Sequence, residues 1–203
     1  DALDLYKEDP RLRDWDMTIY PDSDGEPMAE TDIHRDQMVD LITALQEHYQ
    51  NEDVYVSGNI LLYYEKGEPR SHISPDVLIV FGIKNEPREI YRTWLEGKPP
   101  DLVVEITSKT TKFKDVGIKK GLYEALGVRE YLLFDLTGDY LTPNFQAYRL
   151  VDGIYVRALL PENTGFLSQF GLQFRVVDGE LRVYDSQSRL LMTPTEKARP
   201  CRS

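Results

Sequence analysis

Residues 101–135 constrain the fold most, because their pattern is strand, helix, strand. Asp101–Thr107 is rich in β-branched side chains, as strands are. Lys112–Leu126 has apolar residues at helical spacing, and Gly127 suits the position just past a helix end. Arg129–Asp135 has the character of a second strand. Two strands separated by a helix at this spacing predict a crossover unit in which the strands run parallel.

A helix is predicted upstream of this unit, over Asp32–Gln50, because its apolar residues recur at helical spacing. These residues are Met38, Leu41, Ile42, Leu45 and Tyr49. Either Thr31 or Asp32 can cap the start of this helix.

Strands are predicted between this helix and the crossover unit. Val54–Tyr64 is β-branched and aromatic but is interrupted at residues 57–59, which predicts two strand pieces joined by a bend. Ser74-Pro75-Asp76 then leads into a strand over Val77–Phe81. A loop follows, and we expect a short helix in it around Tyr91–Leu95.

The C-terminal third carries a different pattern, of short strands and tight turns. The dipeptides Asp152-Gly153 and Asp178-Gly179 predict two β-hairpins. We therefore expect a mixed α/β (α+β) fold with an antiparallel β-hairpin extension. The predicted divisions are a polar N-terminal segment (residues 1–30), a core (31–142), the extension (143–190) and a loose tail (191–203).

Composition limits the compartment and the type of metal site. The chain of 203 residues contains one cysteine, Cys201, which excludes a disulfide framework and a cysteine metal site. Residues 1–15 lack the apolar region of a signal peptide, and no apolar run is long enough for a membrane span. We expect a cytoplasmic protein. The three histidines lack zinc-ligand spacing, so carboxylates would hold any metal, and they suit Mg²⁺ or Mn²⁺.

Glu105 is the most informative acidic residue, because it stands in the middle of an apolar strand. Alternation puts it on one face with Asp101, Val103 and Thr107. Burying a carboxylate is costly unless it has a partner, and a metal ion would be such a partner. Exposure to solvent, or an ordinary ion pair, explains the pattern equally well.

Two aspartates are candidates to join Glu105. Asp101 lies four residues away on the same strand, a Cα separation of roughly 13 Å, so we expect at most an outer role for it. Asp76 begins another strand and can approach Glu105 if the two strands are neighbours. Both aspartates directly follow a proline, so each could instead only mark the start of its strand, and for Asp101 this is the favoured interpretation.

Lys119 falls near the middle of the apolar stripe of the predicted helix, beside Val116, Leu122 and Tyr123. A lysine there either extends its ammonium to the rim or projects toward the sheet and its carboxylates. Basic residues cluster around it, which suits contacts to a phosphate backbone, although a solvated helix start is the alternative. The other members of this cluster are Lys109, Lys112, Lys114 and Lys120.

Together these motifs resemble the Uma2 family of restriction endonuclease-like proteins, over about residues 25–150. The stretches that carry the resemblance are Ser74–Val77, Pro100–Ser108, Asp115–Tyr123 and Gly127–Tyr131, with Met28–Thr31 and His34 upstream. The resemblance implies a PD-(D/E)XK nuclease core of order αβββαβ, which is also the order of the elements predicted above. It implies the fold more firmly than the activity.

The resemblance also implies roles for individual residues. Asp76 and Glu105 match the acidic positions of the motif and would bind Mg²⁺ or Mn²⁺. The position two residues after Glu105 holds Thr107, where the general motif has lysine. In this family the lysine comes from the following helix, and Lys119 occupies the matching place. The expected activity is metal-dependent hydrolysis of DNA, with Thr107 helping to position water, and many such nucleases are homodimers.

Two other functions stay open at this point. The net charge of −11 argues against a general nucleic-acid binder and favours a catalytically silent binding or assembly module with the same fold. A carboxylate–metal hydrolase of a small phosphorylated molecule would instead need a closed pocket.

Overall fold

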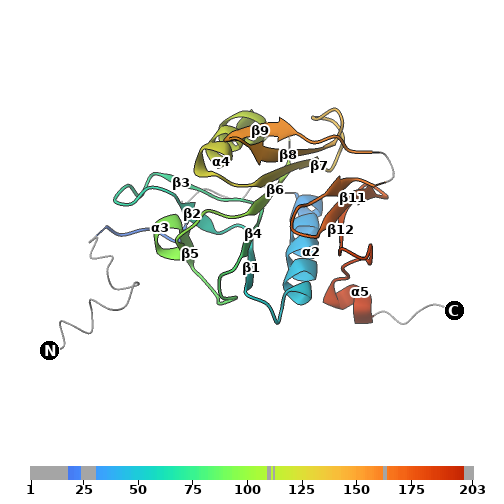
Figure 1. Cartoon of the computed structure of the whole chain (residues 1–203), viewed down its shortest axis with the longest axis horizontal. Coiled ribbons are helices and arrows are strands. Elements are labelled where there is room, and N and C mark those ends of the chain that lie inside the picture. The colour runs from blue at the N-terminus through green and yellow to red at the C-terminus, as the bar shows by residue number, and fades with distance from the viewer. Residues whose placement is uncertain (1–17, 24–30, 109–110, 112, 162–163, 199–203) are drawn as a thin grey trace.

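The computed structural model describes residues 18–23, 31–108, 111, 113–161 and 164–198 (Figure 1). Its centre is a six-stranded sheet with strand order β1-β4-β6-β7-β8-β9. These strands are β1 (Val54–Ser57), β4 (Val77–Phe81), β6 (Leu102–Thr107), β7 (Glu130–Asp135), β8 (Phe145–Val151) and β9 (Ile154–Arg157). The fold is mixed α+β, as predicted.

Strand β6 pairs in parallel with β7, while its other neighbour, β4, runs antiparallel to it. The parallel pair confirms the predicted crossover unit. The remaining neighbours in this sheet are antiparallel. The two strand pieces predicted in residues 54–64 are β1 and β2 (Leu61–Tyr63), and they belong to different sheets.

Two small sheets and several helices surround the central sheet (Figure 1). One small sheet joins β2 to β3 (His72–Ile73) and β5 (Ile90–Arg92), and the other contains β10 (Phe166–Leu167), β11 (Gln173–Val177) and β12 (Glu180–Tyr184). The helical segments are α2 (Asp32–His48), α3 (Thr93–Glu96), the π-helix η1 (Lys114–Lys119), α4 (Lys120–Leu126) and α5 (Pro194–Ala198). None of the helices in the described ranges has the length and apolar character needed to cross a membrane.

Two apolar clusters pack on the two faces of β6. Leu102, Val104 and Ile106 pack with α2 and with the β10–β12 sheet. Val103 faces the other way and packs with Tyr123 of α4. Glu105 and Thr107 therefore lie on the face of β6 that α4 covers, as the alternation of side chains predicts.

Helix α2 matches its prediction closely. The Thr31 side chain caps it by accepting a hydrogen bond from the backbone N–H of His34, and Met38, Leu41 and Leu45 are buried. Figure 1 shows α2 between the central sheet and the β11–β12 hairpin, so the helix is covered on two sides. Its N-terminal turn lies against the end of β6, where Ile106 accepts a hydrogen bond from His34.

The helix predicted over Lys112–Leu126 is not a uniform α-helix. Lys114–Lys119 forms a π-helix before α4 begins at Lys120, while Lys112 lies outside the described residues. Val116, which helical spacing places on the apolar stripe of this helix, does not face the core, since it is 40% exposed. The wider π-turn changes which side chains face the sheet, and Asp115 takes the buried position, at 1% exposure.

The hairpins of the C-terminal third form at the predicted dipeptides. The φ values are 51° for Asp152 and 80° for Gly153, and 53° for Asp178 and 84° for Gly179. These positive φ values are the left-handed backbone that a two-residue hairpin turn requires. Strands β8 and β9 continue the central sheet, because β8 pairs with β7. The stretch expected to be a loose tail contains α5.

Candidate active site

Glu105 lies in β6, is 0% exposed, and has a partner on each carboxylate oxygen. The Tyr123 hydroxyl donates to Oε1 at 2.7 Å, and Lys119 Nζ donates to Oε2 at 2.7 Å. Both partners come from the helical segment that follows β6. Of the alternatives that the sequence leaves open for Glu105, exposure to solvent is therefore wrong.

Asp76 stands one residue before β4, the antiparallel neighbour of β6. The register of the two strands pairs Val77 with Val104, and continuing it by one residue places Asp76 across from Glu105. Asp76 is 8% exposed, and its Oδ2 accepts a hydrogen bond from the backbone N–H of Ile106 at 2.7 Å. The strands are thus neighbours, as the approach of Asp76 to Glu105 requires.

From α2, His34 reaches the backbone of the same residue, Ile106. Its Nε2 contacts the Ile106 carbonyl oxygen and lies 3.6 Å from Asp76 Oδ2. With the proton on Nε2, His34 donates to this carbonyl while Asp76 accepts from the N–H of the same residue. The Ile106 backbone is therefore held from both sides, directly between Glu105 and Thr107.

Gly58 positions the segment that carries Asp76. This glycine lies in the bend between β1 and β2, and a Cβ atom there would be 1.9 Å from the Asp76 carbonyl oxygen. Asn59, with a φ of 52°, donates its N–H to the Pro75 carbonyl oxygen at 2.9 Å. The interruption at residues 57–59 thus lets the two backbones approach closely.

Lys119 projects toward the sheet, which is one of the two directions that the sequence allows. Besides Glu105, its Nζ lies 3.3 Å from Asp115 Oδ1 and 3.4 Å from the Ser74 carbonyl oxygen. The residue pattern alone does not identify Asp115 as a site residue, although it precedes Lys119 by four residues and lies within the stretch that resembles the family. Asp115 is buried because this segment is a π-helix, and the residue pattern does not predict a π-helix.

The charges in this site shift the pKa values of its members. Burial raises the pKa of Glu105 to about 8, and Asp76 and Asp115 add to this while Lys119 opposes it. Burial lowers the pKa of the Lys119 ammonium, but Glu105, Asp115 and Asp76 outweigh it and raise that pKa above its ordinary value. Burial and Glu105 raise the pKa of Tyr123, so its hydroxyl remains a proton donor at neutral pH.

Thr107 lies on the same face of β6 as Glu105 and is 3% exposed. Its Oγ1 has no hydrogen-bond partner among the described residues. A buried hydroxyl without a partner is unusual in a folded protein. Thr107 therefore offers a hydrogen-bonding group two residues from Glu105.

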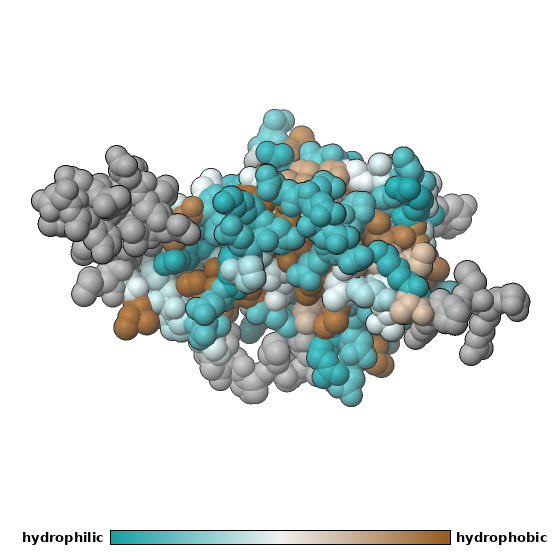
Figure 2. Space-filling model, turned by 90° about the horizontal axis from the view of Figure 1, so that it is seen from below, coloured by the Kyte–Doolittle hydropathy of each residue, from teal (hydrophilic) through white to brown (hydrophobic). Residues whose placement is uncertain are grey.

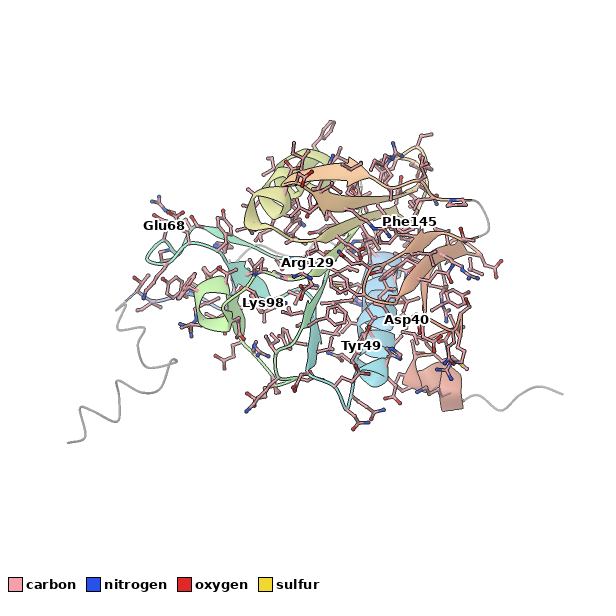
Figure 3. All side chains as sticks on the ribbon, in the orientation of Figure 1. Asp40, Tyr49, Glu68, Lys98, Arg129 and Phe145 are labelled. Carbon is pink, nitrogen blue, oxygen red and sulfur yellow. The ribbon has the colours of Figure 1, made fainter. Side chains whose placement is uncertain are left out.

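Asp101 is occupied elsewhere, at the start of β6. Lys98 Nζ contacts its Oδ2 at 2.6 Å, Phe81 donates its backbone N–H at 2.8 Å, and Arg129 Nε lies 3.8 Å from its Oδ1. Figure 3 labels Lys98 and Arg129 close together beside this part of the sheet. The structure does not bring Asp101 together with Glu105, which agrees with the spacing argument.

The basic cluster is only partly described. Lys114 is exposed, and Lys120 Nζ lies 4.0 Å from the centre of the Tyr148 ring, a cation–π contact. Lys109 and Lys112 lie outside the described residues. Lys119 is thus the member of the cluster whose ammonium the structure places against Glu105.

Comparisons with known proteins agree with this fold. The crystal structure of "a putative nuclease belonging to DUF820" from Anabaena variabilis ATCC 29413 matches with a TM-score of 0.52 and 13% identity, over 73% of this chain and 80% of that one. At this identity the likeness shows the fold alone, and it confirms the predicted nuclease-like fold. No curated protein matches the chain. The model of the Uma2 family, described as "Putative restriction endonuclease", matches residues 7–183, and the chain therefore belongs to the Uma2 family.

Proposed function

We propose that this protein is a metal-dependent endonuclease that hydrolyses phosphodiester bonds in DNA. The observation that carries the proposal is the meeting of Asp76 and Glu105 from neighbouring strands, with Lys119 Nζ 2.7 Å from Glu105. Two carboxylates and a lysine, buried on a nuclease-like fold, match the chemistry of a PD-(D/E)XK site. Membership of the Uma2 family supports the same substrate class.

Asp76 and Glu105 would hold Mg²⁺ or Mn²⁺, with Thr107 nearby. Their oxygen atoms are the ligands that these ions prefer, and the Thr107 hydroxyl, which has no partner among the described residues, would bind a water molecule there. In the described ranges, no group of three or more His, Cys, Asp or Glu side chains is arranged as a complete metal site, so the fit rests on these residues. When bound, the ion lowers the pKa of a water molecule and neutralises charge on the phosphate.

The residues of the chain supply the rest of the mechanism. Lys119 carries a positive charge and would stabilise the negative charge that develops on the phosphate. Tyr123 holds Glu105 in place through its hydrogen bond to Oε1. Thr107 would orient the attacking water.

Binding of the DNA backbone would fall to the basic cluster. Lys109, Lys112, Lys114 and Lys120 are the proposed phosphate contacts. Because the whole chain has a net charge of −11, these contacts act locally, and binding should weaken steeply with salt. The proposal includes a cytoplasmic location, and a homodimer for cutting both strands, which light scattering would test.

Cleavage of supercoiled plasmid and of single-stranded DNA in Mg²⁺ or Mn²⁺ tests the activity. The wild type should cut, and Glu105→Gln and Asp76→Asn should not. Glu86→Gln is a matched control, because Glu86 is an exposed acid paired with Lys84 at 3.7 Å. Full cleavage by either site variant would overturn the residue assignment, and absence of metal-dependent cleavage in the wild type would overturn the proposed activity on these substrates.

The silent binding module is the second candidate, and the ion pair between Lys119 and Glu105 favours it. In this arrangement the lysine satisfies Glu105 Oε2 without a metal ion. If the protein is a silent binding module, it should bind DNA or a partner protein without cutting DNA, and Mn²⁺ should not change its stability.

A further inference from the structure

The Lys119 ammonium lies between two buried carboxylates. Its Nζ is 2.7 Å from Glu105 Oε2 and 3.3 Å from Asp115 Oδ1. Glu105 is 0% exposed and Asp115 is 1% exposed. The ammonium is therefore closer to Glu105 than to Asp115, and it contacts both.

The two carboxylates differ in what else they bind. Glu105 is also held by the Tyr123 hydroxyl, whereas neither Asp115 oxygen has a hydrogen-bond partner among the described residues. A fully buried carboxylate without hydrogen bonds is costly unless a charge compensates it. Asp115 therefore has acceptor capacity that only Lys119 approaches in the described part of the chain.

The local backbone keeps Asp115 in this position. Asp115 and Lys119 are both on η1, and Tyr123 follows four residues later on α4. The Tyr131 hydroxyl, from β7, donates to the Asp115 carbonyl oxygen at 2.9 Å. Asp115 is thus fixed by the helix and by the sheet, and the lysine between the carboxylates is the long, rotatable side chain.

A divalent cation at Glu105 would compete with Lys119. The ammonium already occupies Oε2, and two cations on one carboxylate oxygen repel each other strongly at low dielectric. The lysine would therefore have to shift for an ion to bind Glu105. Asp115 is the buried acceptor within a short movement of its side chain.

We propose that Asp115 is a positioning residue that receives the Lys119 ammonium when a divalent cation binds Glu105. Asp115 would keep the lysine charged and close to the place where the phosphate binds, so that the lysine does not compete with the metal ion for Glu105. This inference rests on the metal site of the proposed function and adds a role for a residue on η1.

Titration with Mn²⁺, followed by calorimetry, tests this role without measuring cleavage. The four proteins are the wild type, Asp115→Asn, Lys119→Met and the double variant. Lys119→Met should bind Mn²⁺ more tightly than the wild type, because it removes a competing cation. Asp115→Asn should weaken Mn²⁺ binding about tenfold when Lys119 is present, and by less than about threefold in the Lys119→Met background.

The double-mutant cycle separates this role from direct metal binding. Equal weakening by Asp115→Asn in both backgrounds would mean that Asp115 acts on the ion itself, which overturns the inference and leaves the metal site standing. If neither the wild type nor Lys119→Met binds Mn²⁺ at millimolar concentration, the metal site of the proposed function fails as well.

A second measurement uses the folded wild type and does not depend on an Asp115 variant. The NMR signal of the Asp115 side-chain carboxyl carbon should move when Mg²⁺ is added to the wild type, and should stay in place in Lys119→Met. A signal that moves equally in both proteins would contradict the transfer of the lysine to Asp115.

Discussion

The Tyr123 hydroxyl donates a 2.7 Å hydrogen bond to Glu105 Oε1, and both side chains are fully buried. This contact joins α4 to the middle of β6. It leaves Glu105 with one oxygen facing Lys119 and one facing Tyr123, so the orientation of the carboxylate is set before any ligand binds.

Tyr123→Phe should destabilise the protein by about 1–3 kcal/mol, since a hydrogen bond to a buried carboxylate is lost while the ring is kept. Urea denaturation measures this change, and plasmid cleavage should fall with it. Tyr155→Phe is the matched control, because the Tyr155 hydroxyl donates to the Val128 carbonyl oxygen at 2.8 Å. Equal loss of cleavage in both variants would argue against a special role for Tyr123.

Gly58→Ala should displace Asp76 and reduce stability by about 1–3 kcal/mol, because the new methyl group would overlap the Asp76 carbonyl oxygen. Thermal unfolding and Mn²⁺ titration would show both effects. Gly121→Ala is the control, since no atom of the described residues lies within 4 Å of a Cβ there and the position is helical. It should be neutral or stabilise by up to about 1 kcal/mol. Undiminished Mn²⁺ binding in Gly58→Ala would count against the positioning role of the bend.

His34→Ala should loosen the end of β6, because the Ile106 carbonyl oxygen loses its side-chain donor from α2. We expect a loss of about 1–3 kcal/mol and faster exchange of the backbone amides next to Glu105. His34→Gln keeps a side-chain donor and should recover part of the loss. If His34→Ala leaves amide exchange at Ile106 and Thr107 unchanged, His34 does not hold this part of β6 in place.

Glu196 gives the C-terminal helix α5 a pH-dependent anchor. Burial opposes the shift, but the Thr193 backbone N–H and the Arg182 guanidinium lower the pKa of Glu196 below its ordinary value of 4.5. A lowered folded-state pKa stabilises the protein above pH 4.5, and this contribution is lost as the pH falls through the folded value. Glu196→Gln should cost up to about 1 kcal/mol at pH 7.

The cost of the same substitution should become smaller between pH 7 and pH 3, because the pH falls toward the lowered folded-state pKa of Glu196 and its carboxylate takes up a proton. Denaturation curves at the two pH values measure the difference. A penalty that is equal at both values would show that the charge of Glu196 does not contribute, and would contradict the pH-dependent anchor. The magnitude is small because both side chains of the Glu196–Arg182 pair are partly exposed.

Local sequence rules account for the elements and for the face on which the main acid lies. The helical spacing of Met38, Leu41 and Leu45 produces α2, because one apolar stripe must be buried. Asp152-Gly153 produces a hairpin turn, because its left-handed backbone suits those residues. Strand alternation places Glu105 and Thr107 on one face of β6 whatever the rest of the chain does.

The tertiary structure alone decided which side chains meet Glu105. Asp76 lies across from it through the pairing of β4 with β6, and Asp115 reaches Lys119, the partner of Glu105, through a π-turn that the residue pattern does not predict. His34 reaches Ile106 across 72 residues of sequence. Strand pairing and helix register depend on packing over the whole core, so they cannot be predicted from a local residue pattern. Single residue types can identify the chemistry of a site, but its geometry depends on contacts between distant parts of the chain.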